Sequence, residues 1–235
     1  MSVEVLTGNI FTSKCQTLVN TINCVGVMGA GIALECRLRY PSMFTRYKEL
    51  CNQRMLKPGV LWLYKASLAL FDINEKWILN FPTKIHWHNP SQMEWIVLGL
   101  DKFMSVYREK GISSIAFPVL GSLNGGLNPH EVISIMTEKL EACEIPVEIY
   151  QYQADAPDDL FEHFKLLFMN TDAADIAKVC GMRMDMIKRI KDAIGGLTIH
   201  QLNQLAKFDG IGAKTLEKAF GIMRLDIPKQ MELQL

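Results

Sequence analysis

The stretch TLVNTINCVGVMGAGIAL, residues 17–34, carries the strongest fold signal in this chain. It opens with an apolar run typical of a buried strand, passes the amides Asn20 and Asn23, and enters a glycine-rich turn before a helix-like segment. Such a strand–loop–helix junction can bind an anion, because backbone N–H groups point outward and the helix dipole favours negative charge. The spacing G-x-x-G-x-G is neither the dinucleotide fingerprint nor a P-loop, so a ligand loop and a tight structural turn both remain open.

Two further segments resemble this junction. WILNFPTKIHW, residues 77–87, and FPVLGSLNGGL, residues 117–127, each begin with a strand-like run and end in amides, glycines or ring side chains. Binding residues in α/β sheets gather at the carboxyl ends of strands. Three strand ends of this kind favour a ligand site over a purely structural turn.

These strings together resemble the macrodomain family, and within it most closely the macrodomains of the DarG antitoxins. The terminal ADP-ribose glycohydrolases of animals are a more distant match. The matching stretches occur in the family's order, at residues 20–23, 26–34, 80–84 with 86–87, and 125–127. The resemblance covers about residues 1–153 and implies a three-layer α/β/α macrodomain with a mixed central sheet, which binds or hydrolyses ADP-ribose.

The composition agrees with a globular protein. The 235 residues, 49% of them apolar, suffice for one medium and one small domain. Twenty-five basic residues balance 25 acidic ones, so no global charge indicates a nucleic-acid or membrane partner. The six cysteines include no C-x-x-C pair, and neither a leader nor a membrane-length apolar run is present. We therefore expect a soluble, cytoplasmic protein with reduced thiols.

Strands and helices alternate in the first two thirds of the chain, which favours a mixed sheet covered on both faces. Two helix starts are well marked: Ser91 with Glu94 forms a capping-box pattern, and Asn128 precedes a first-turn proline. We expect strands near residues 3–6, 17–22, 60–65, 77–80, 114–118 and 147–152, and helices near residues 31–39, 41–53, 91–110 and 129–143.

After a small, polar, proline-containing stretch at residues 153–159, the chain is expected to form a small all-α domain, residues 160–235. The glycine and apolar spacing around Gly181 fits a helix-turn-helix. Residues 205–214 resemble a helix-hairpin-helix motif, which implies phosphate contact at Gly210, Gly212 and Lys214. Residues 176–224 hold nine Lys or Arg against four Asp or Glu, a net charge of +5. A nucleic-acid or partner surface and a plain helical bundle with solvated charges are both consistent with this pattern.

Lys84 is the candidate catalytic residue. Burial at a strand end disfavours the charged form of a lysine and so yields a nucleophilic amine. The resemblance implies that this lysine attacks the anomeric carbon of the distal ribose and forms a covalent intermediate; a purely electrostatic role is the alternative. Asn128 stands where the glycohydrolases usually carry an aspartate that assists the lysine. An amide cannot transfer a proton at neutral pH, so slow or absent turnover is expected.

The resemblance also implies an ADP-ribose site in a cleft between the glycine loops. In this interpretation two amides, Asn20 and Asn23, bind the distal ribose, Asn9 reads the adenine, and the glycines approach the diphosphate. No cofactor is expected, and no metal, since His86 and His88 have no evident third ligand. The expected ADP-ribose-binding residues are Asn9, Ile10, Asn20, Asn23, Gly29, Ala30, Gly31, Ile32, Thr83, Gly121, Ser122, Leu123, Asn124, Gly125, Gly126 and Leu127.

The resemblance implies a glycohydrolase that removes ADP-ribose from DNA bases and so acts as an antitoxin against a DarT-type toxin. Two alternatives remain: a weak or inactive ADP-ribose reader, and an interaction protein whose helical region contacts a toxin or DNA. The expected partners are ADP-ribose or ADP-ribosylated DNA, with a DarT-like toxin and a DNA contact by the C-terminal domain as further candidates, and no membrane.

Overall fold

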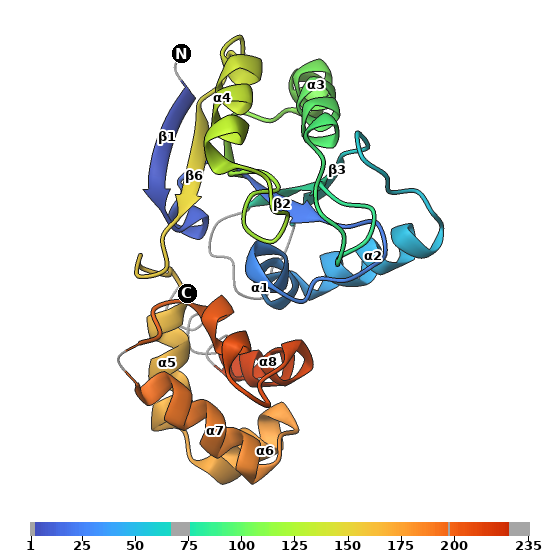
Figure 1. Ribbon diagram of the computed structural model, residues 1–235. Helices are drawn as coiled ribbons and strands as arrows, with labels where there is room; N and C mark the ends of the chain where they lie inside the picture. The colour runs from blue at the N-terminus through green and yellow to red at the C-terminus, as the bar shows by residue number, and fades with distance from the viewer. Residues whose placement is uncertain (1–2, 67–75, 197, 226–235) are drawn as a thin grey trace, which may run out of the picture. The chain divides into compact units, whose positions relative to one another are not determined.

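The computed structural model describes residues 3–66, 76–196 and 198–225. The chain divides into two compact units, Met1–Gln153 and Ala154–Leu235. The first unit contains the sheet and the second is helical (Figure 1).

A six-stranded mixed sheet forms the centre of the first unit. Its order is β1-β6-β5-β2-β4-β3, and every described pair is parallel except β3 with β4. This arrangement confirms the expected α/β fold class. The strands are β1 (Val3–Gly8), β2 (Thr17–Ile22), β3 (Trp62–Lys65), β4 (Trp77–Pro82), β5 (Ile115–Pro118) and β6 (Val147–Tyr152).

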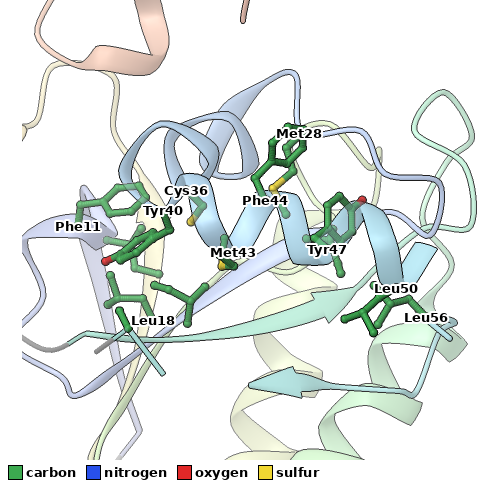
Figure 2. Packing of buried hydrophobic residues seen from close by; sticks show 14 of the residues in the cluster. Phe11, Leu18, Met28, Cys36, Tyr40, Met43, Phe44, Tyr47, Leu50 and Leu56 are labelled. Atoms are coloured by element: carbon green, nitrogen blue, oxygen red, sulfur yellow. The ribbon is translucent and has the colours of Figure 1, made fainter. Parts of the chain in front are cut away.

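Helices cover both faces of the sheet (Figure 1). One face packs against α1 (Gly31–Arg39) and α2 (Pro41–Asn52), and the other packs against α3 (Met93–Lys110) and α4 (Pro129–Leu140). A short 3₁₀ turn, η1 (Ile10–Thr12), lies between β1 and β2 in the chain. Alternation along β2 divides its side chains accordingly, because successive residues of a strand point to opposite faces. Leu18 joins the cluster under α1 and α2, shown in Figure 2, and Val19 joins the cluster under α3 and α4.

A close helix–sheet contact fixes the end of β4. The ring of Phe81 lies so near α3 that a Cβ on Gly99 would approach its Cζ to 2.0 Å. Only glycine fits there, because real Cβ atoms do not come that close to a packed ring. The contact anchors the strand just before Thr83 and Lys84, and so determines where the following loop begins.

The second unit is built entirely from helices in its described residues. They are α5 (Phe161–Asn170), α6 (Ala173–Cys180), α7 (Met184–Gly195), η2 (Leu202–Lys207), α8 (Ala213–Phe220) and η3 (Gly221–Leu225). Gly181 ends α6 with a left-handed φ of 59°, as the expected turn between two helices requires. No described helix of the protein is long and apolar enough to cross a bilayer.

Of the two helix starts expected from the sequence, one is confirmed and the other is wrong. The Asn128 cap is confirmed: its Oδ1 accepts from the N–H of His130 at 3.0 Å, and Pro129 opens α4. The capping box at Ser91 is wrong, because α3 begins at Met93 behind Gln92 and has no side-chain cap. Ser91 is instead buried, and its N–H donates to Gly125 O at 2.9 Å.

Candidate functional site

Three loops meet at one edge of the sheet. They follow β2, β4 and β5, which are neighbours and run parallel, so their carboxyl ends lie together. We name them the first loop (residues 23–30), the second loop (residues 83–92) and the third loop (residues 119–128). Backbone hydrogen bonds join them: Cys24 N–H donates to Ile85 O at 3.0 Å, and Ser91 N–H donates to Gly125 O at 2.9 Å. The structure therefore brings the three strand ends together, and the ligand site expected there stays a prediction.

Lys84 lies at the junction of the second and third loops. Its side chain is buried, with 9% of its surface exposed, and Nζ donates to the carbonyls of Asn124 and Trp87. Burial lowers the pKa of Lys84 below its ordinary value, because the charged form loses solvation. No ion pair in the described part of the chain opposes this effect at Lys84. A buried amine with a lowered pKa has the properties of a nucleophile.

Asn23 organises the first loop. Its Oδ1 accepts from the N–H groups of Val25 at 3.0 Å and Val27 at 3.3 Å, and from the hydroxyl of Tyr47 at 3.0 Å. Its Nδ2 donates to Val27 O at 2.5 Å. The amide therefore holds the loop in one conformation by bonding within the protein, whereas the sequence suggested a contact with ribose.

Asn20 lies below the loops, inside the sheet. It is fully buried, and its Nδ2 donates to Asn80 Oδ1 at 2.9 Å across the β2–β4 pair. Its own Oδ1 is buried without a hydrogen-bond partner. Asn20 thus links two strands and is buried in this structure, and the expected ribose contact stays a prediction.

The first loop ends at the N-terminus of α1, where an anion is favoured. Ala30 is the N-cap and makes no side-chain cap, and the first turn from Gly31 and Ile32 contains no acid. Gly29 has room beside it, since a Cβ there would lie 3.8 Å from a Val27 methyl. Gly31 has φ +55°, and its Cβ would lie 3.0 Å from Asn124 Nδ2, which places the first loop beside the third.

The third loop is tightly wound on itself. A Cβ at Gly125 would lie 2.1 Å from Gly121 O and 2.4 Å from Ser91 Oγ. Gly121 and Gly126 have φ of +67° and +78°. The loop is closed by hydrogen bonds from Leu127 N–H to Gly121 O and from Gly126 N–H to Ser122 O, both 3.1 Å. Its tip, Leu123, is exposed.

Of the other expected residues, Asn9 and Ile10 lie outside the three loops, whereas Thr83 and Asn128 belong to the second and third loops. Asn9 and Ile10 are buried where β1 ends, and Asn9 Oδ1 accepts from Phe11 N–H at 3.1 Å. Thr83 is buried, and its N–H donates to Ile22 O at 3.0 Å. Asn128 is exposed and caps α4; in the described part of the chain it forms no hydrogen bond with Lys84. The proposed catalytic pair is therefore not joined by a direct bond.

Two residues that shape the site were missed from the sequence. Ser91 supports the third loop from below, and Tyr47 anchors Asn23 from α2. Tyr47 lies 24 residues from Asn23, and nothing in the local pattern marks the pair. Ser91 had a marked pattern, but it resembled a helix cap, and the tertiary contact with Gly125 took precedence.

The sheet order, the two helical layers and the glycine loops at the carboxyl ends of three parallel strands define a three-layer α/β domain. The chain belongs to the macro domain family, whose Macro domain model matches residues 19–136, about half of the chain.

Among relatives, a DNA ADP-ribosyl glycohydrolase of Mycobacterium tuberculosis is 43% identical over 125 residues, which is 53% of this chain and 35% of the relative. The chain thus spans only about a third of that relative's length. The solved macrodomain of M. tuberculosis DarG has a TM-score of 0.58 and 36% identity, and covers 63% of this chain and 98% of that one. The structure of Thermosipho africanus DarTG in complex with ADP-ribose has a TM-score of 0.57 and 35% identity, over 66% of this chain and 43% of that one.

Proposed function

We propose that the first unit binds ADP-ribose and removes it from ADP-ribosylated DNA, as a DNA ADP-ribosyl glycohydrolase. The observation that carries this proposal is Lys84, a buried lysine with a lowered pKa at the junction of three loops. The likeness to relatives named for this activity, one of them solved with ADP-ribose, supports the same reaction.

In the proposed reaction the neutral amine of Lys84 attacks the anomeric carbon of the distal ribose. A C–N bond forms at the lysine, and the glycosidic bond breaks with its electron pair leaving on the DNA base. The new bond makes the lysine nitrogen cationic. This nitrogen then loses one proton, and the departing base takes up one proton, so the step is balanced. Water then displaces the lysine from the anomeric carbon and releases ADP-ribose.

The test is single-turnover release of ADP-ribose from an ADP-ribosylated single-stranded DNA oligonucleotide. Lys84→Ala should abolish release yet leave the affinity for free ADP-ribose largely intact, because the amine acts in the transition state. Lys102→Ala, an exposed lysine on α3, is the matched control. If the ring of the lysine-bound ribose opens, its ring oxygen takes up the proton and the C–N bond becomes an imine; borohydride should reduce this imine and trap the ADP-ribose adduct in the native protein and not in Lys84→Ala. Equal loss of binding and release in Lys84→Ala would indicate an electrostatic role.

A second function, an ADP-ribose reader, is favoured by one observation. The three loops contain neither Asp nor Glu, and Asn128 occupies the cap of α4 as an amide. A site whose loops lack a carboxylic acid for proton transfer can bind ADP-ribose without cleaving it from DNA. If calorimetry shows that free ADP-ribose binds, and no ADP-ribose is cleaved from ADP-ribosylated DNA over many hours, the reader function is supported over the enzyme.

We further propose that the protein acts as an antitoxin in the bacterial cytoplasm, where its DNA substrate is found. The likeness to DarTG supports a DarT-like toxin as its functional counterpart. Co-expression should rescue cells from such a toxin, and Lys84→Ala should remove the rescue. Rescue that persists in Lys84→Ala would indicate that the protein blocks the toxin by binding it.

For the second unit we propose a contact with DNA phosphates at the turn before α8. Gly210 has φ +77°, Gly212 is the N-cap of α8, and Lys207 and Lys214 are exposed on either side. Nearby, Arg189 Nη1 donates to Asp209 O at 3.4 Å. The double variant Lys207→Glu with Lys214→Glu should weaken DNA binding and reduce its salt dependence, and Lys165→Glu on α5 should not. Equal effects of both changes would indicate a general charge effect.

A further inference from the structure

The three loops of the first unit expose apolar side chains. Each carries at least one large hydrophobic side chain that the core does not cover. Exposed apolar side chains that gather on neighbouring loops are a candidate binding surface. The exposed residues are Val25 and Val27 on the first loop, Ile85 and Trp87 on the second, and Leu123 on the third.

The centre of this surface is a group of three rings on consecutive residues of the second loop. The rings of His86 and His88 have centroids 3.9 Å apart, and the Trp87 ring meets His88 edge-on at 5.2 Å and His86 at 5.9 Å. Trp87 is 55% exposed, although tryptophan is mostly buried in proteins. An exposed tryptophan braced by two rings presents a ready stacking surface.

This ring group adjoins the proposed nucleophile. Lys84 Nζ donates to the backbone carbonyl of Trp87 at 3.4 Å, so the ring group and the amine belong to one short turn. A group that leaves from the anomeric carbon at Lys84 would therefore depart beside these rings. ADP-ribose itself would extend toward the N-terminus of α1, where the first turn contains no acid.

The charges of the three loops suit a nucleic acid. Residues 23–30, 83–92 and 119–128 contain no Asp or Glu, and Lys84 is their one formal charge. Loops without carboxylates do not repel phosphodiester groups, and two histidines provide donors for phosphates or base edges. Apolar loops would also suit a protein partner, but three adjoining rings provide the aromatic faces on which bases of single-stranded nucleic acid stack, and the loops carry no acid that would repel the phosphate backbone.

We propose that Trp87, with His86 and His88, is a stacking platform for the nucleobase that carries ADP-ribose in single-stranded DNA. The platform recognises the leaving group and not ADP-ribose. Since a base inside a duplex cannot reach such rings, the preferred substrate is single-stranded or has the modified base turned out of the stack. This inference rests on the proposed reaction at Lys84, and its test separates the two.

The test measures three quantities in parallel. They are the affinity for an unmodified single-stranded DNA oligonucleotide by fluorescence anisotropy, single-turnover release from the ADP-ribosylated oligonucleotide, and the affinity for free ADP-ribose by calorimetry. Trp87→Ala should weaken oligonucleotide binding about tenfold, as loss of one base–aromatic stack does, and should leave free ADP-ribose affinity unchanged. Trp87→Phe keeps a ring and should recover most of the loss. Leu98→Ala, equally exposed but on α3, is the matched control and should change nothing.

Three outcomes would overturn the platform. Unchanged oligonucleotide affinity in Trp87→Ala would exclude stacking. A loss of binding to a protein toxin in the same variant would not rescue the proposal, since it would indicate a protein partner. Equal loss of ADP-ribose and oligonucleotide affinity would place Trp87 in the ADP-ribose site. No recovery in Trp87→Phe would show that a ring is not what matters. If the native protein releases no ADP-ribose, the proposed reaction fails. The affinities of the native protein and of Trp87→Ala for the unmodified oligonucleotide then test the platform by themselves.

Discussion

Gly125→Ala is the substitution for which the structure makes the sharpest prediction. The added Cβ would lie 2.1 Å from Gly121 O and 2.4 Å from Ser91 Oγ. Neither neighbour can yield cheaply. Gly121 O is a backbone atom that accepts from Leu127 N–H at 3.1 Å, and the Ser91 backbone is tied to Gly125 O at 2.9 Å. The third loop must therefore open to accommodate a single methyl group.

The size of the effect follows from this overpacking. Inserting a methyl group where no space exists costs about 1–3 kcal/mol. For a unit of this size each kcal/mol lowers Tm by about 2–4 °C, so we expect a fall of roughly 4–8 °C for a cost of about 2 kcal/mol. The opened loop also moves the neighbouring Asn124 carbonyl, which accepts from Lys84 Nζ. ADP-ribose release should therefore slow although the lysine itself is unchanged.

The measurements are thermal unfolding by circular dichroism and single-turnover release of ADP-ribose. Gly29→Ala is the matched comparison, because its Cβ would meet only a Val27 methyl at 3.8 Å. Its Tm should stay near that of the native protein, while its ADP-ribose affinity should fall if the backbone at Gly29 approaches the diphosphate. A Gly125→Ala protein with native Tm and native release rate would refute the assignment of the third loop as a rigid support for Lys84.

Three further outcomes are expected. The single-turnover rate should rise with pH through the lowered pKa of Lys84 and then level off, because only the neutral amine attacks; a rate that rises nowhere below about pH 10 would oppose a nucleophilic role. In denaturant titrations Lys84→Met should raise the free energy of unfolding at neutral pH, because burial penalises the ammonium below its folded pKa; this gain should shrink as pH rises toward the unfolded value of about 10.4, and a gain that grows with pH would contradict the sign. Asn128→Asp should speed single-turnover release by about 10²–10⁴-fold if a missing acid limits the reaction, with Tm unchanged because Asp and Asn cap helices equally well. No change in rate would show that Lys84 works without an acid at this position.

Much of the first unit could be predicted because its signals are local. The apolar run before Asn20 defines β2, and the pattern Asn128-Pro129 defines the start of α4. The meeting of the three loops was predictable too, since parallel neighbouring strands end at the same edge of a sheet. The fold class and the meeting of the three loops therefore follow from residue patterns within short windows and from the rule for parallel strands.

The roles of individual polar residues were harder to predict, because they depend on contacts between distant segments. The burial of Asn20 could have been predicted: period-2 alternation puts it on the same face of β2 as Leu18 and Ile22, which is covered by helices. Ser91 could not, since its burial depends on Gly125 in a loop that forms only in the folded domain. The local capping pattern is genuine in the sequence, and tertiary packing overrides it.

The hydrogen bonds of Lys84 Nζ link the packing of the loops to the proposed nucleophilic attack. An ammonium carries three donor hydrogens, whereas a neutral amine carries two and a lone pair. The structure provides Nζ with two carbonyl acceptors, from Asn124 and Trp87, and with no carboxylate among the described residues. A neutral amine can bond both acceptors and still keep its lone pair for the anomeric carbon. Burial favours this neutral form by lowering the pKa of Lys84, and the position of Nζ depends on a third loop that only glycine at position 125 allows to close.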